Sequence, residues 1–140
     1  MTIATLAALL LAAAAPSVAD RAALDAAVAA IYRPYATPDG MNPMWEYPVY
    51  STGTAALIAS WRRVAPDEEP DDLSDGDWFC LCQDWQRLRA GVAGREMLGP
   101  NRASLRVRVD LGGGQTRNLR MIFVRERGRW KLDDLFATRD

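Results

Sequence analysis

Histidine is absent from this 140-residue sequence, and cysteine occurs only twice. Without histidine, Ser-His-Asp catalysis, Cys-His catalysis and histidine-ligated zinc are excluded, and the commonest general base at neutral pH is missing. A phosphate-binding glycine motif is also lacking, because the run Gly112–Gly114 joins two expected strands and opens no helix. We therefore expect no metal and no other cofactor, and any proton chemistry would have to use a carboxylate.

The apolar run of residues 3–15 is too short to span a membrane, which takes about 20 residues. It is followed by Pro16 and by Ser17-Val18-Ala19, the small-x-small pattern that signal peptidase accepts. We interpret residues 1–19 as a signal peptide cleaved after Ala19, although no Lys or Arg precedes the run; an apolar first helix is the alternative. The interpretation predicts a periplasmic or secreted protein without a stable membrane anchor, in which residues 20–140 form a single domain.

The 17 basic and 18 acidic residues are distributed unevenly. Residues 87–131 hold twelve bases and three acids. Residues 64–86 hold eight acids and no base, namely Asp67, Glu68, Glu69, Asp71, Asp72, Asp75, Asp77 and Asp84. Nucleic-acid binding would need one basic field, and an acidic segment in the same small domain argues against it. The pattern predicts either solvated faces or a site for a charged partner.

The clearest periodicity lies at residues 102–111, where apolar side chains alternate with polar ones, as in a strand with one buried face. The apolar positions are Ala103, Leu105, Val107, Val109 and Leu111. Gly112–Gly114 and Gly128 can take the positive φ angles of hairpin turns, which predicts three consecutive antiparallel strands ending near Phe136. A less regular strand is expected at residues 86–98.

Two amphipathic helices are expected before the sheet. Residues 20–33 place Leu24, Val28 and Ile31 on one side, and Pro34 ends the pattern. Ser51 or Thr52 can cap a second helix that ends at Pro66, in which Leu57, Ile58, Trp61 and Val64 share a side. The predicted fold is an α+β domain with two N-terminal helices packed on a curved antiparallel sheet of about four strands.

Two carboxylates are candidates for catalysis. Strict alternation places Asp134 on the apolar side of its strand with Trp130 and Leu132, where desolvation would raise its pKa and allow it to act as an acid or base. An Asp that forms an ion pair, caps backbone amides or follows a β-bulge is the alternative. Asp84 is similar, either as a pocket carboxylate or as a loop cap.

Aromatic residues could line a cavity for an apolar ligand, although large rings also fill ordinary cores. We expect such a pocket between the helices and the sheet, with these candidate lining residues: Tyr32, Trp45, Trp61, Trp78, Trp130 and Phe136.

The two cysteines, Cys80 and Cys82, are separated by one residue. After export they would meet an oxidising environment, and they can pair if the backbone turns enough to bring their Cα atoms within disulfide range. We expect this disulfide as a local staple; a redox role is the alternative, since so short a ring gains little loop entropy.

Several short motifs resemble those of a known family. Tyr32-x-x-Tyr35, the pair Gln83-Asp84 after the cysteines, and the closing Trp130-Lys131-Leu132-Asp133-Asp134 resemble the exported bacterial proteins of domain of unknown function family 3828 over about residues 24–136. The order of elements is similar to the nuclear-transport-factor-2-like (cystatin-like) cone. The resemblance implies that fold and a small periplasmic or secreted protein with no assigned chemistry.

From these expectations we interpret the chain as a binding or accessory module for an unknown small molecule or protein. A carboxylate-dependent hydrolase, isomerase or dehydratase using Asp134 is one alternative. Pairing of two copies through the open sheet face is another, so the chain could be a monomer or a homodimer.

Overall fold

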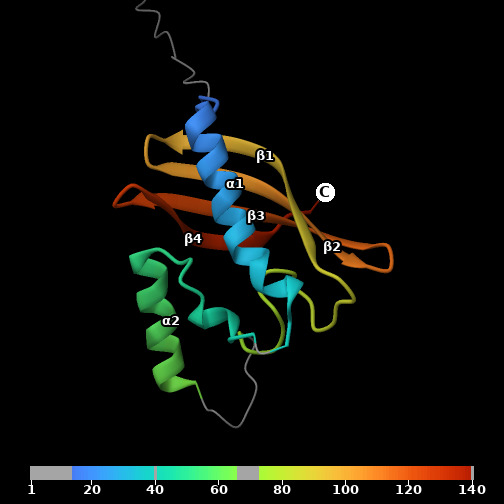
Figure 1. Cartoon of the computed structure of the whole chain (residues 1–140). Helices are drawn as coiled ribbons and strands as arrows, with labels where there is room; N and C mark the ends of the chain where they lie inside the picture. The colour runs from blue at the N-terminus through green and yellow to red at the C-terminus, as the bar shows by residue number, and fades with distance from the viewer. Residues whose placement is uncertain (1–13, 40, 66–72, 140) are drawn as a thin grey trace, which may run out of the picture.

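The computed structural model of the protein describes residues 14–39, 41–65 and 73–139 (Figure 1). Two helices precede a four-stranded antiparallel sheet in the order β1-β2-β3-β4, which confirms the predicted α+β class. Two 3-10 turns, η1 and η2, lie between the helices. The bounds are α1 Val18–Tyr32, η1 Arg33–Ala36, η2 Met44–Glu46, α2 Thr52–Val64, β1 Arg89–Gly99, β2 Arg102–Gly112, β3 Gln115–Glu126 and β4 Arg129–Ala137.

The predicted alternation in β2 is confirmed. All five apolar positions are buried, and they form a continuous wall with buried side chains of β3 and β4, including Met121, Phe123 and Leu132. Gly112–Gly114 and Gly128 have positive φ values between 61° and 81°, as the two predicted turns require. The strand β1 is less regular, as expected, with register shifts after Val92 and after Met97.

The helix α1 lies across one face of the sheet (Figure 1). It buries Leu24, Val28 and Ile31 against the apolar wall, as their spacing predicts. Asp25 binds the guanidinium of Arg95 on β1 through two hydrogen bonds of 2.7 Å, which fixes the helix along the sheet. Of the two helices predicted to pack on the sheet, α1 therefore does so.

The second helix, α2, does not cover the sheet, and this part of the prediction is wrong. Its main contacts with the sheet are to β4, with hydrogen bonds from Thr52 to Glu126 at the end of β3. It buries none of its residues, and Leu57 and Val64 are 72% and 80% exposed. Figure 1 shows α2 beside the β4 edge of the sheet, and not across the strands as α1 is. Ser51 is the N-cap, as expected, and its hydroxyl also donates a hydrogen bond to the Asp133 carboxylate on β4. This tether fixes the start of α2 at the sheet edge, so that the helix extends away from the sheet.

The chain before α1 bears on the predicted signal peptide. Residues 1–13 lie outside the described part. Ser17 caps α1 by accepting a hydrogen bond from the Asp20 amide, Pro16 is buried, and the Met97 amide bonds to the Ala14 carbonyl at 3.4 Å. All three contacts involve residues before the predicted cleavage point, so cleavage after Ala19 would remove them. Among the described helices, none has the length and apolar character needed to cross a membrane.

Candidate ligand-binding groove

A cluster of three tryptophans holds α2 away from the sheet. Trp45, Trp61 and Trp78 come from η2, α2 and the loop of residues 73–82, and their ring centroids lie 5.6 to 6.3 Å apart. The guanidinium of Arg62 lies 4.9 Å from the Trp45 ring and 5.5 Å from the Trp61 ring, within the range of cation–π attraction. The cluster is thus a spacer between the helix and the rest of the domain.

Residues 49–51 position the start of α2 against β4. The Leu132 amide donates to the Val49 carbonyl and the Ser51 amide donates to the Leu132 carbonyl, each at 2.8 Å. Glu126 accepts hydrogen bonds from the amide and hydroxyl of Thr52, where a carboxylate also complements the helix dipole. Held at one end by these bonds and supported by the tryptophans farther along, α2 leaves a space beside β4.

That space is an open groove of about 580 Å³ between α2, the loop of residues 73–82 and β4. Leu132 and Leu135 of β4 line it on the sheet side. Its other walls are mostly apolar, formed by Leu57, Ile58, Trp61, Leu73, Trp78 and Leu81. The volume lies within the range of small-molecule sites, roughly 300 to 1,000 Å³.

Three of the wall residues are leucines that water contacts extensively. Leu57 is 72% exposed, Leu73 50% and Leu81 41%. Single exposed leucines are common, but three around one hollow form a contiguous apolar patch. Filling the groove with an apolar body would remove this surface from water and stabilise the complex.

Polar groups border the groove along β4. The Thr54 hydroxyl donates to the Asp133 carbonyl at 2.6 Å, and Asp133 accepts hydrogen bonds from Ser51 at 2.8 Å and Arg102 at 3.1 Å. Asp134 also borders the groove, and its carboxylate accepts a hydrogen bond from the Leu135 amide at 2.8 Å. The groove therefore combines apolar walls with a hydrogen-bond-accepting border.

A β-bulge at Asp133 overturns the predicted direction of Asp134. Phe123 pairs with Leu132, whereas Ile122 pairs with Asp134, so Asp133 is an extra residue in β4. After the bulge, Leu135 instead of Asp134 faces the core, and Asp134 is exposed. The prediction that Asp134 points inward with Trp130 and Leu132 is therefore wrong, because strict alternation fails at the extra residue.

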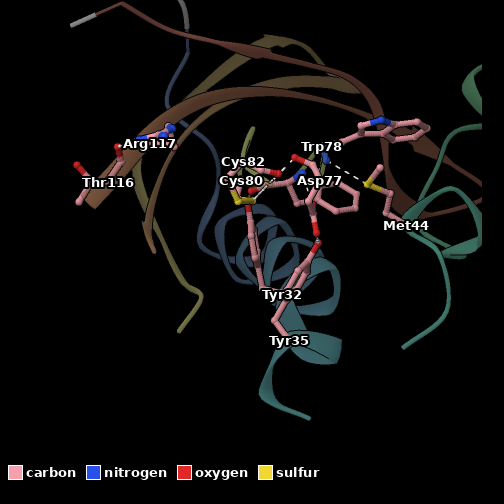
Figure 2. The surroundings of a disulfide bond; sticks show 10 residues. Tyr32, Tyr35, Met44, Asp77, Trp78, Cys80, Cys82, Thr116 and Arg117 are labelled. Carbon is pink, nitrogen blue, oxygen red and sulfur yellow. Dashed lines mark hydrogen bonds between the residues drawn. A yellow bond between two sulfur atoms is a disulfide. The ribbon is translucent and has the colours of Figure 1, made fainter. Parts of the chain in front are cut away.

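The loop that forms one wall is anchored through Asp77 (Figure 2). Tyr35 donates to Asp77 Oδ2 at 2.5 Å, and the Phe79 amide donates to Asp77 Oδ1 at 2.8 Å. Tyr32 donates to the Phe79 carbonyl at 2.7 Å. Figure 2 shows both tyrosines pointing from the end of α1 and from η1 toward this loop.

Burial controls the protonation of these tyrosines. Desolvation raises the pKa of Tyr32 and Tyr35 well above the usual tyrosine value, and the negative charge of Asp77 raises both further. Tyr47 is also buried, and its hydroxyl has no hydrogen-bond partner among the described residues. Burial raises the pKa of Tyr47 as well, so all three hydroxyls remain protonated at neutral pH. Tyr32 and Tyr35 act as hydrogen-bond donors and not as bases.

The predicted Cys80–Cys82 disulfide is present and closes the same loop, with Cα atoms 5.2 Å apart. Leu81 between the cysteines has φ of 50°, the left-handed conformation that brings the two sulfur atoms together. The Asp77 amide donates to the Cys82 carbonyl at 2.8 Å. The disulfide and the Asp77 contacts together hold Trp78 and Leu81 in the groove wall.

The predicted pocket residues lie in separate places. Trp61 and Trp78 line the groove, and Trp45 packs behind them. Tyr32 and Trp130 are buried in the core, and Phe136 is 42% exposed on a strand position paired with Arg120. The prediction of a single pocket lined by all six residues is therefore wrong.

The leucines of the groove were not among the predicted pocket residues. The helical spacing predicts Leu57 on the covered side of its helix, and the exposed position of Leu81 follows from the turn that the disulfide closes. The signal that could have found the groove is the side that Leu57, Ile58 and Trp61 share.

Asp84 lies away from the groove. It is exposed and borders a second, more polar cleft of about 530 Å³ together with Asp75, Gln83, Cys82 and Arg117. Within the described ranges, no three acidic or cysteine side chains are grouped as they would be around a metal ion.

Comparison with known proteins gives no relative: no family model, curated protein or solved structure matches the chain. Fold and site together describe an α+β domain with one covered sheet face and an apolar groove at the β4 edge.

Proposed function

We propose that the protein is a binding module that holds a small apolar molecule in the groove between α2 and β4. The observation that carries the proposal is the clustering of exposed leucines. Three of the seven large hydrophobic side chains that the described surface exposes, Leu57, Leu73 and Leu81, line this one hollow. Contiguous exposed apolar surface of this kind is typical of interaction sites.

The border of the groove indicates the polar end of the ligand. An ionised carboxylate only accepts hydrogen bonds, and Asp134 is exposed beside the apolar walls. A ligand with an apolar body and one donating or cationic end would satisfy both features. The rings of Trp61 and Trp78 offer flat surfaces for the apolar body.

The alternative of a carboxylate-dependent enzyme receives less support from the same geometry. An Asp acid or base at neutral pH needs an apolar, water-excluded surrounding that shifts its pKa. Asp134 is exposed and bonded to the Leu135 amide, and Asp84 is exposed in a polar cleft. Binding is therefore the function that these residues favour.

We also propose that the fold is a cone of the nuclear-transport-factor-2-like type, that the chain belongs to unknown-function family 3828, and that it is exported. The order of two helices before an antiparallel meander supports the fold, and the motifs at Tyr32, Cys80 and Trp130 support the family. The Cys80–Cys82 disulfide supports an oxidising compartment.

Mass spectrometry of the protein recovered from the periplasm or medium of a bacterial host tests export. The expected mature chain begins at Asp20. Recovery of an intact chain from the cytosol alone would contradict the proposal. A mature chain beginning at Ala14 or earlier would keep the Ser17 cap and require a different cleavage site.

Fluorescence titration with the uncharged probe N-phenyl-1-naphthylamine tests the groove. We expect saturable binding by the wild-type chain and about tenfold weaker binding by Leu57→Gln, because the substitution removes apolar contact worth about 1.4 kcal/mol. Val64→Gln is the matched control. Val64 is 80% exposed on the same helix but does not line the groove, so this variant should bind as the wild type does.

Equal affinities of the three proteins would place the probe elsewhere and refute the groove as the binding site. Because Leu57 and Val64 are both exposed, neither substitution should lower the thermal unfolding midpoint appreciably. A circular dichroism melt of each variant checks that binding, and not folding, has changed.

A further inference from the structure

The face of the sheet opposite α1 carries a group of arginine side chains. Neither described helix lies over this face (Figure 1). Because side chains alternate along a strand, the residues between the buried positions of β2 and β3 point to it. They include three arginines at the centre of the sheet: Arg106, Arg108 and Arg120.

The register of the strands groups these arginines and leaves space for them. Arg106 lies opposite Arg120 on one side and Gly94 on the other, and Arg108 lies opposite Gly91. A Cβ atom at Gly94 would come within 2.7 Å of the Arg106 guanidinium, so this guanidinium lies over the bare backbone of β1.

These three arginines differ from three other arginines of the sheet in having no ion pair with any acidic side chain that the structure describes. Arg95, Arg102 and Arg125 form ion pairs with Asp25, Asp133 and Asp20, respectively. Within the described ranges, no such pair includes the three central arginines.

The central arginines also carry an electrostatic and solvation cost. The Nε of Arg120 is buried without a hydrogen-bond partner in the described part of the chain. Like charges directly opposite each other on neighbouring strands destabilise a sheet. The same face also carries Glu96, Asp110 and Asp134, which form no ion pair with these arginines within the described ranges. The free protein therefore has a group of unpaired arginines and an unsatisfied donor on one open surface.

We propose that Arg106, Arg108 and Arg120 form a binding site for a small, soluble, multiply charged oxyanion of the phosphate or sulfate type. Guanidinium groups present forked donors that match the oxygens of such anions, and charge-assisted hydrogen bonds are the strong ones. A dianion would relieve the repulsion between Arg106 and Arg120. The site is separate from the apolar groove, and its test does not depend on ligand binding there.

Two-dimensional ¹H–¹⁵N NMR titration with sodium phosphate, compared with sodium chloride at equal ionic strength, tests the site. We expect saturable shifts in phosphate alone, centred on the amides of Gly91, Gly94, Arg106 and Arg120. The double variant Arg106→Gln/Arg120→Gln should bind at least tenfold more weakly. Arg129→Gln removes an exposed charge at the start of β4 and should bind as the wild type does.

Gly94→Ala is a second variant that changes no charge. Its new methyl group would displace the Arg106 guanidinium, and we expect a several-fold loss of phosphate affinity. The double variant removes like charges that face each other, so it should unfold at the same temperature as the wild type or higher in phosphate-free buffer. A folded Gly94→Ala protein with full affinity would contradict the role of Arg106.

Three other outcomes would overturn the proposal. Equal shifts in phosphate and chloride would indicate general screening. Binding to phosphatidylglycerol vesicles without binding to phosphate would indicate a lipid surface. Sedimentation showing a dimer that the double variant abolishes, again without phosphate binding, would assign the face to a second copy of the chain.

Discussion

At the scale of single residues, Asp77 links the loop of residues 73–82 to the buried tyrosines of the core. Its two carboxylate oxygens accept hydrogen bonds from the Tyr35 hydroxyl and the Phe79 amide. Tyr47 lies in the same interior, but its hydroxyl has no partner among the described residues. Of these two buried tyrosines, Tyr35 therefore donates a hydrogen bond to a carboxylate, whereas Tyr47 donates none within the described residues.

This difference predicts opposite results for two matched substitutions. Tyr35→Phe removes a donor to a charged acceptor, and we expect the free energy of unfolding to fall by about 1 to 3 kcal/mol. Tyr47→Phe removes a buried hydroxyl without a partner, so the free energy should stay within about 1 kcal/mol of the wild type or rise. Urea unfolding at neutral pH measures both. An equal loss in the two variants would show that ring packing, and not the bond to Asp77, decides stability.

At the scale of elements, the helix α2 and the strand β4 decide the geometry of the groove. Their connection depends on Ser51, which is 1% exposed, accepts a hydrogen bond from the Thr54 amide and donates one to Asp133. The same residue is thus the N-cap of the helix and a tether to the strand.

Ser51→Ala should therefore lower the free energy of unfolding by about 1 to 2 kcal/mol, because both roles are lost. Ser60→Ala, on the exposed part of α2, removes a solvent-exposed hydrogen bond from Arg63 and should change it by less than about 0.5 kcal/mol. Chemical denaturation of the two variants provides the comparison. A Ser51→Ala protein as stable as the Ser60→Ala protein would show that α2 does not depend on this tether.

The elements also show where sequence reasoning succeeds and fails. Leu24, Val28 and Ile31 in α1 and the alternating residues of β2 are predictable because each pattern is regular and matches one buried face. The direction of the Asp134 side chain is not predictable in this way. Alternation assumes that no residue is inserted, and the bulge at Asp133 depends on pairing with β3.

The position of α2 was equally inaccessible from its own sequence. Leu57, Trp61 and Val64 do share a side, but periodicity cannot tell whether that side meets the sheet, other side chains or water. Contacts from distant residues decide it: Trp45 and Trp78 support Trp61, while Val64 remains exposed.

At the scale of the whole molecule, three surfaces are separated. One sheet face is covered by α1, the opposite face is open and basic, and the groove lies at the β4 edge beside α2. The disulfide and the Asp77 contacts stabilise one groove wall, and the Ser51 tether fixes the other. The proposed apolar ligand would therefore bind without any change in the sheet.

The most direct test of this account is isotope-filtered NOE spectroscopy. It uses methyl-labelled protein with unlabelled N-phenyl-1-naphthylamine bound. The account predicts NOEs from the probe to the methyl groups of Leu57, Leu81 and Leu135, which line the groove from its three sides. NOEs that instead connect the probe to Val18, Val64 or Leu98, which are exposed elsewhere, would contradict it.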